Sequence, residues 1–279
     1  MKLTSYSKLE NSSAMDLMAR ALNGSGHGTS EQIRSISIAA PAYNESQGIV
    51  PVVEHWLEYL RGRTDLERFE IVICNDGSKD DTAGKLKAIG ASSDELVVIE
   101  HPVNQGAGAA VATAISGTTS DWVLLVDSDG QFAIENFEVL RDALQKSGTP
   151  AAIGVRTTKV DSLFARFGSW SSGMLCNVFH RTRYRDFNSA CKLVKGDLLR
   201  SLRLECKGLN YSTDVTSKLI ERGVRIAEAE IAHLPRETGT SSLRKFRGAR
   251  DRFLFVMYLG FRQFLIRMRI LRAFKYEAN

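Results

Sequence analysis

The sequence contains no apolar run of 18 or more residues, the length from which a membrane-spanning helix is predicted. The longest candidate, residues 253–261, is interrupted by Arg262 and Gln263. The amino terminus has polar residues where a secretory signal peptide needs an apolar core. We therefore expect no spanning helix and a cytoplasmic location.

Cysteine is scarce, and its spacing excludes two classes of protein. The four cysteines form neither a C-x-x-C pair nor a zinc-type pattern: Cys74, Cys176, Cys191 and Cys206. Without a secretory signal, a disulfide-linked scaffold is not expected either. We predict four reduced thiols.

The charge is unevenly distributed. The chain has 279 residues, of which 25% are charged and 43% hydrophobic, as in ordinary globular proteins. The formal net charge of +5 is too small to indicate nucleic-acid binding. However, residues 244–275 contain ten Lys or Arg against a single acid, Asp251. Any electrostatic attraction to an anionic partner is therefore expected from the carboxy-terminal part.

Strands and helices are predicted to alternate after a flexible Ser-, Asn- and Gly-rich segment, residues 1–34. Short apolar runs predict strands at 35–40, 69–74, 95–100, 121–127 and 151–155. Helical patterns separate them at 50–60, from 82, at 107–115 and at 134–145. This alternation is typical of an α/β protein with a doubly wound parallel sheet.

The most informative stretch is 121–130, where five apolar residues lead into Asp127, Ser128 and Asp129. A buried strand ending there would place both carboxylates at the sheet edge where ligands bind in open α/β folds. Two close carboxylates repel each other unless a cation lies between them, and hard divalent ions prefer oxygen ligands. The stretch therefore predicts a Mg²⁺ or Mn²⁺ site, with a solvated acidic turn as the alternative.

Polar turns also follow the first three predicted strands, at 41–45, 75–82 and 104–108, and the last two contain glycine. All of them would lie on the same edge of the sheet as Asp127. Asp76 can accept hydrogen bonds from a base or ribose, or can serve only as a turn residue. Gly106 either lets the backbone approach a ligand or simply starts a helix.

The segment beyond residue 156 is rich in arginine and aromatic residues but carries no nucleic-acid-binding motif, so no such partner is expected. Residues 244–274 predict a long helix with one apolar side: Phe253, Met257, Phe261, Phe264, Met268 and Leu271. Arg252, Arg262 and Arg269 lie mostly opposite. This helix either packs on the domain or lies in the interface of an anionic membrane as a peripheral contact.

Four motifs in this order resemble the family 2 glycosyltransferases with the GT-A fold, and among them the polyprenyl-phosphate sugar transferases. They are the residues at 41–45, 75–82, 104–110 and 127–131. The resemblance covers roughly 35–247. It implies a Rossmann-like, mostly parallel sheet with an acceptor-side extension, and a catalytic domain at 35–243. That domain would lie between the extension 1–34 and a basic amphipathic helix at 244–279.

The resemblance also implies roles for individual residues. The nucleotide-sugar site would be formed by Pro41, Tyr43, Glu45, Asp76, Gly106, Asp127, Ser128, Gln131, Arg156 and Arg166. Asp127 and Asp129 would hold Mg²⁺ or Mn²⁺ against the diphosphate. Arg236 would contact phosphate, because a guanidinium binds phosphate oxygens in pairs. Asp214 occupies a position where the family commonly has an acid near the acceptor.

By this resemblance the chain would be an inverting, metal-dependent enzyme that moves a sugar from GDP-mannose or a UDP-hexose to a polyprenyl phosphate. Residues 188–192 depart from the usual family pattern, so a hydroxyl acceptor on a polysaccharide or glycolipid remains an alternative. A non-catalytic nucleotide-sugar-binding scaffold is a second alternative. The sequence does not indicate the oligomeric state.

Overall fold

The structure, a computed structural model, describes residues 32–157, 163–234 and 245–271, with side chains except those of 163–167 and 245–249. The elements in chain order are β1 (Ser35–Ala42), α2 (Ile49–Arg61), β2 (Arg68–Asn75), α3 (Thr82–Gly90), β3 (Leu96–Glu100), α4 (Ala107–Gly117), β4 (Trp122–Leu125), α5 (Asn136–Ser147), β5 (Ala151–Arg156), α6 (Leu163–His180), β6 (Lys192–Lys195), α7 (Gly196–Arg200), α8 (Tyr211–Glu221), β7 (Ala227–Ile231) and α9 (Lys245–Arg267). The predicted domain limits 1–34, 35–243 and 244–279 fall in or beside residues outside this description and stay predictions.

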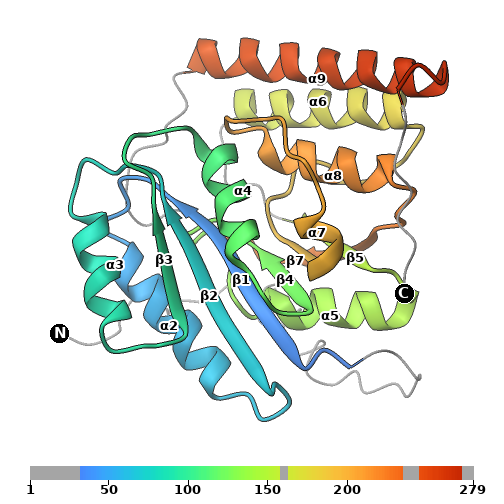
Figure 1. Cartoon of the computed structure of the whole chain (residues 1–279). Helices are drawn as coiled ribbons and strands as arrows, with labels where there is room; N and C mark the ends of the chain where they lie inside the picture. Colours follow the sequence, from blue (N-terminus) through green and yellow to red (C-terminus); the bar gives the residue numbers. More distant parts are fainter. Residues whose placement is uncertain (1–31, 158–162, 235–244, 272–279) are drawn as a thin grey trace.

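The strands form one seven-stranded sheet in the order β3-β2-β1-β4-β6-β5-β7 (Figure 1). Neighbouring strands are parallel except at β6, which is antiparallel to both β4 and β5. The predicted doubly wound, mostly parallel α/β sheet is therefore confirmed. Because β1, β2 and β4 are parallel, their carboxyl ends lie at one edge of the sheet, and the strand order changes direction between β1 and β4.

The core explains why the apolar runs become strands. Ile71, Val72 and Ile73 in β2 are fully buried, as expected for a parallel strand covered by helices on both faces. Helix α2 contributes Val53 and Trp56 to the same cluster. All four cysteines are free and buried, so the predicted reduced thiols are confirmed.

Helices α6 and α9 lie side by side in a separate layer, at the top of Figure 1, above α8. Val256 and Leu259 of α9 pack with Cys176 and Phe187 in a small second core. Within the described residues, we find no helix with both the length and the apolar character needed to cross a membrane.

The orientation of α9 shows which side of the helix packs on the domain. The residues predicted to form its apolar side are the exposed ones, from Leu271 at 37% to Phe261 at 60% of full exposure. Arg262 lies opposite that side, as predicted, and therefore faces α8, where it pairs with Glu221 at N–O distances of 3.1 Å. Periodicity reveals an apolar stripe but not which stripe packs on the domain, and here Val256, Leu259 and Gln263 do so.

Candidate active site

The predicted acidic pair lies where β4 ends. The strand stops at Leu125, and the backbone N–H of Val126 still donates to the Ala39 carbonyl of β1 at 3.2 Å. Asp127 and Asp129 follow, with Ser128 between them donating its hydroxyl to the Pro41 carbonyl at 2.6 Å. This hydrogen bond fixes the acidic turn against the turn that follows β1.

Asp127 is the electrostatic centre of this edge. The pKa of Asp127 is raised to about 6, mainly by burial and then by the charge of Asp129, while a hydrogen bond from the Tyr211 hydroxyl acts in the opposite direction. Tyr211 is 4% exposed and begins α8, so a helix far along the chain supports the carboxylate. The raised pKa reflects the cost of keeping a buried carboxylate charged beside a second one, a cost that a bound cation would reduce.

The donor set fits a divalent cation that shares its coordination with a phosphate ligand. Mg²⁺ and related ions are commonly held by one or two carboxylates together with substrate phosphate oxygens. Among the residues that the structure describes, no cluster of three or more His, Cys, Asp or Glu forms a complete protein cage. Asp127 and Asp129 therefore suit an ion bound together with a diphosphate rather than a permanent structural metal.

Asp76 directly follows β2 and is almost wholly buried, at 1% exposure. Its carboxylate accepts hydrogen bonds from the backbone N–H groups of Gln105, at 2.9 Å, and Gly106, at 2.8 Å. His101 lies 2.7 Å from the same carboxylate and 2.9 Å from the Thr113 hydroxyl. These contacts match the turn role predicted as the alternative, and a nucleotide contact by Asp76 stays a prediction.

The turns after β1 and β2 are joined to each other. Asn44, at φ 56°, donates its N–H to the Ser78 hydroxyl at 3.0 Å, and its side-chain oxygen accepts from the Lys79 N–H at 2.8 Å. Glu45 donates its N–H to the Thr82 hydroxyl at 2.9 Å. This cross-linking holds the 41–45 turn at the same sheet edge as the acidic pair.

The predicted sugar-site residues Pro41, Tyr43, Glu45 and Gln131 are partly accessible at this edge. Gln131 donates its N–H to an Asp129 carboxylate oxygen at 3.1 Å, which shapes the acidic turn.

Gly106 and Gly108 lie against the backbone of another part of the chain and do not face open space. A Cβ on Gly106, at φ +101°, would lie 2.3 Å from the Lys207 carbonyl oxygen. The N–H of Gly108 donates to that same oxygen at 2.9 Å. Gly106 was predicted to allow a close approach of the backbone to a ligand. The close contact at this start of α4 is instead made by residues 206–208 of the chain itself.

Arg156, predicted to contact phosphate, ends β5 and pairs with Asp186 through two bonds of 2.8 and 3.0 Å. Arg156 also lowers the pKa of Asp127, so its charge acts on the acidic pair. Arg236 and the Arg166 side chain lie outside the described residues, and their predicted phosphate contacts stay predictions.

Asp214 lies inside the protein at 0% exposure. One carboxylate oxygen accepts the N–H groups of Glu205 and Cys206, at 2.6 and 2.9 Å. The other has no hydrogen-bond partner among the described residues. Burial is the main cause of its raised pKa. The structure therefore shows Asp214 supporting the 205–206 turn, and its acceptor-side catalytic role stays a prediction.

Sequence reasoning missed Tyr211, His101 and Lys192. Lys192 on β6 is fully buried, and burial lowers the pKa of its ammonium group to about 7. Its charge acts on Asp127 across the sheet. No spacing rule pointed to these residues, because each reaches the site through strand order or helix docking rather than through proximity in sequence.

Comparison with known proteins places this geometry in context. The sequence model of "Glycosyl transferase family 2" matches residues 37–204. A dolichyl-phosphate beta-glucosyltransferase of Trichomonas vaginalis is 34% identical over 113 residues, which are 39% of this chain and only 35% of that protein. A dodecaprenyl-phosphate galacturonate synthase of Rhizobium johnstonii is 23% identical over 77% of this chain and 64% of its own length.

Among solved structures, glucosyl-3-phosphoglycerate synthase from Mycobacterium tuberculosis in complex with Mn²⁺ and UDP-glucose aligns with a TM-score of 0.64. The alignment covers 88% of this chain and 82% of that one at 18% identity, so it establishes the fold alone. The predicted GT-A fold is confirmed. The chain spans little more than a third of the length of the first of these relatives, and it belongs to glycosyl transferase family 2.

Proposed function

We propose that this enzyme moves a sugar from a nucleoside diphosphate sugar to a polyprenyl phosphate, and that a divalent cation at Asp127 and Asp129 is required. The observation that carries the proposal is this acidic pair at the end of β4, fixed to the β1 turn through Ser128. A mechanism follows in which the diphosphate leaves as the acceptor attacks the anomeric carbon of the sugar.

Negative charge grows on the leaving diphosphate during this reaction, and preorganised charges at that place stabilise the transition state most. Mg²⁺ or Mn²⁺, when bound, would neutralise part of that charge. Asp127 and Asp129 would hold the cation, and the Tyr211 hydroxyl keeps one Asp127 oxygen occupied and oriented. Arg156, fixed by Asp186, adds positive charge nearby.

The buried state of Asp214 favours a phosphate over a hydroxyl as acceptor. A hydroxyl needs a general base within hydrogen-bond reach, whereas a phosphate monoester, with a second pKa near 6, is already largely anionic at neutral pH. Asp214 is buried, and one of its oxygens is occupied by two backbone N–H groups. The names of the two relatives, a dolichyl-phosphate and a dodecaprenyl-phosphate transferase, support the same acceptor class.

An acceptor of this kind resides in a membrane, and the helical layer of α6 and α9 offers a surface for it. Its large exposed apolar side chains are Trp170, Met174, Val178, Phe253, Leu254, Met257, Phe261, Phe264 and Met268. Arg267 and Arg269 are exposed near the end of this surface. Apolar area together with positive charge is what binding to an anionic membrane surface requires. We place the enzyme at the membrane as a peripheral protein, on its cytoplasmic face.

A transfer assay tests the proposal. The full chain is incubated with UDP-glucose or GDP-mannose, with dolichyl or undecaprenyl phosphate, and with Mn²⁺, Mg²⁺ or a chelator. Sugar-linked lipid and released nucleoside diphosphate are both measured. We expect both products with a metal ion and neither with chelator. Transfer that persists in chelator would contradict the metal site, and transfer only to hydroxyl acceptors would favour the alternative enzyme.

A further inference from the structure

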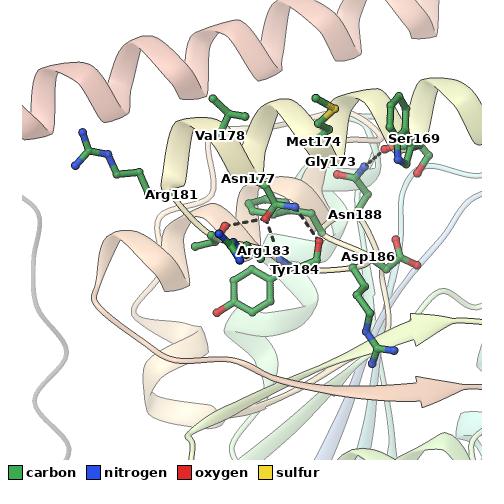
Figure 2. A pocket seen from close by; sticks show the side chains of 14 residues that line it. Ser169, Gly173, Met174, Asn177, Val178, Arg181, Arg183, Tyr184, Asp186 and Asn188 are labelled. Atoms are coloured by element: carbon green, nitrogen blue, oxygen red, sulfur yellow. Dashed lines mark hydrogen bonds between the residues drawn. The ribbon is translucent and has the colours of Figure 1, made fainter.

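A groove of about 660 Å³ lies between α6 and the segment 181–188 (Figure 2). We call it the α6 groove. One wall is the exposed face of the helix, and the other is the returning chain that leads to β6. It is separate from the strand-end turns that carry the acidic pair.

The helical wall presents an apolar stripe. Trp170, Met174 and Val178 are 60, 54 and 61% exposed and recur every four residues, so they lie on one side of α6. At a rise of about 1.5 Å per residue the stripe is roughly 12 Å long. Such exposure of three large apolar side chains in a hollow marks a binding surface rather than ordinary protein surface.

The opposite wall is held in place by Asn177. Its side-chain nitrogen donates to the Tyr184 carbonyl at 2.8 Å, and its oxygen accepts from the Tyr184 N–H at 3.0 Å and the Thr182 hydroxyl at 2.8 Å. Figure 2 shows this fan of bonds between the helix and the segment below it. The groove is therefore preformed, as ligand sites usually are.

One end of the α6 groove is linked to the acidic pair through hydrogen bonds and through helix α8. Asn188 donates to the Ser169 carbonyl at 2.8 Å and accepts from the Thr213 hydroxyl at 2.8 Å. Thr213 lies two residues after Tyr211, whose hydroxyl contacts Asp127. Asp186, which also lines the groove, holds Arg156.

The other end opens beside the exposed helical layer and carries positive charge. Arg181 and Arg183 are exposed, and neither has an ion-pair partner within the described part of the chain. Arg185, by contrast, pairs with Glu230 at 2.7 Å. The two arginines suit the anionic headgroups of a membrane surface.

We propose that the α6 groove binds the isoprenoid chain of the acceptor. The phosphate would lie at the Asn188 end, and the chain would run along Trp170, Met174 and Val178 towards the membrane. An uncharged, apolar polyisoprenoid matches the stripe, and the Asn188 end of the groove is hydrogen-bonded to the helix whose Tyr211 contacts Asp127. This inference rests on the proposed function and names the path that its substrate takes.

Two glycines on α6 provide a matched test. Gly173 lines the groove, and a Cβ there would lie 3.7 Å from both Asn188 and Phe187, so a larger side chain would occupy the groove. A Cβ on Gly168 would meet nothing within 4 Å, and Gly168 does not line the groove. Gly173→Leu and Gly168→Leu are compared with the unaltered enzyme, using detergent-solubilised undecaprenyl phosphate so that membrane binding does not contribute.

We expect Gly173→Leu to raise the KM for undecaprenyl phosphate at least tenfold. Gly168→Leu should leave it within twofold, with donor binding and the thermal unfolding midpoint unchanged in both. An unchanged KM in Gly173→Leu, or an equal increase in both variants, overturns the groove and leaves the proposed function standing. Failure of the unaltered enzyme to glycosylate any polyprenyl phosphate overturns the function itself, and the groove with it.

Chain length gives a second measurement that does not depend on Gly173. In the double variant Met174→Ser, Val178→Ser we expect the KM for the 55-carbon acceptor to rise about tenfold. The KM for a 10-carbon prenyl phosphate, which is too short to contact the whole stripe, should rise less than threefold. Equal effects on both acceptors contradict binding of the chain along α6.

Discussion

In the half of the molecule that contains β1 to β4, polar groups at the strand ends bond to one another: Asp76 to the 105–106 backbone, and Asn44 to the turn after β2. In the half that contains α6, α8 and α9, both ring nitrogens of His180 and one oxygen of Asp214 are buried with no hydrogen-bond partner in the described residues. That half also exposes most of the large apolar side chains. We call the first half the donor side and the second the acceptor side, after the proposed function. The comparison teaches that the turns of the donor side are held by their own hydrogen bonds, whereas the acceptor side exposes an apolar surface suited to something outside this chain.

The largest effect is expected on the donor side, from Asp127→Asn together with Asp129→Asn. Loss of both charges removes the proposed cation site, so kcat should fall at least about 1,000-fold, or about 4 kcal/mol in transition-state stabilisation. Transfer assays with saturating Mn²⁺ measure this. Asp94→Asn, on an exposed loop, serves as the control and should keep full activity. Near-native turnover by the double variant would refute the assigned site.

A surface change on α9 tests the acceptor side. Each buried aromatic contributes about 1.5–3 kcal/mol, so Phe253→Ser, Phe261→Ser and Phe264→Ser together should weaken binding to anionic vesicles at least about 100-fold. Sedimentation with vesicles measures the partition, and nucleotide-sugar binding should not change.

The matched control replaces three exposed apolar residues outside the helical layer: Val97→Ser, Val103→Ser and Leu209→Ser. Comparable loss of vesicle binding in this control would show that general hydrophobicity, rather than the helical layer, drives the interaction.

The buried histidine of the acceptor side should make stability depend on pH. The pKa of His180 is lowered to about 4, mainly by burial and in addition by the charges of Arg267 and Lys218. Below pH 6.5 the unfolded chain therefore binds a proton that the folded protein resists. Stability should be fully present above pH 6.5 and fall with pH, by about 2 kcal/mol at pH 5.

Urea unfolding of the unaltered protein and of His180→Leu at pH 7.5 and pH 5 measures this dependence. The apolar variant should lose less stability over that interval, by about the same 2 kcal/mol. An identical pH dependence in both proteins would show that His180 is not the responsible group.

The smallest effect is expected where the two halves meet, at Tyr211. Tyr211→Phe keeps the ring and removes only the hydroxyl that orients Asp127, and loss of such a supporting hydrogen bond typically costs 10- to 100-fold in metal affinity. We expect about a tenfold rise in the Mn²⁺ concentration needed for half-maximal activity. Tyr258→Phe, whose hydroxyl donates to Glu205 on the acceptor side, should leave it unchanged. Equal metal dependence in both variants would contradict the positioning role.

The sequence predicted the donor side better than the acceptor side. Apolar runs and turn residues are local signals, so the parallel strands and the place of Asp127 and Asp129 at the end of β4 were predictable. The antiparallel insertion of β6 was not, because it depends on which strands neighbour each other. The support that Tyr211 gives to Asp127 spans 84 residues and leaves no periodic trace. On α9 the pattern gave the stripe, and only tertiary packing decided that it faces outward.

Strand β6 has a consequence for how such enzymes diversify. It pairs with β5 at Ile153 opposite Lys192, so the chain departs from the sheet and returns to it at adjacent points. Helix α6 and the 181–188 segment therefore belong to an insertion whose two ends lie next to each other in the sheet. Lengthening or shortening such an insertion changes the entropy of loop closure only slightly. Under the proposed function, evolution or a designer can replace this insertion and so change the acceptor of the sugar, while the strands that hold the acidic pair stay in place.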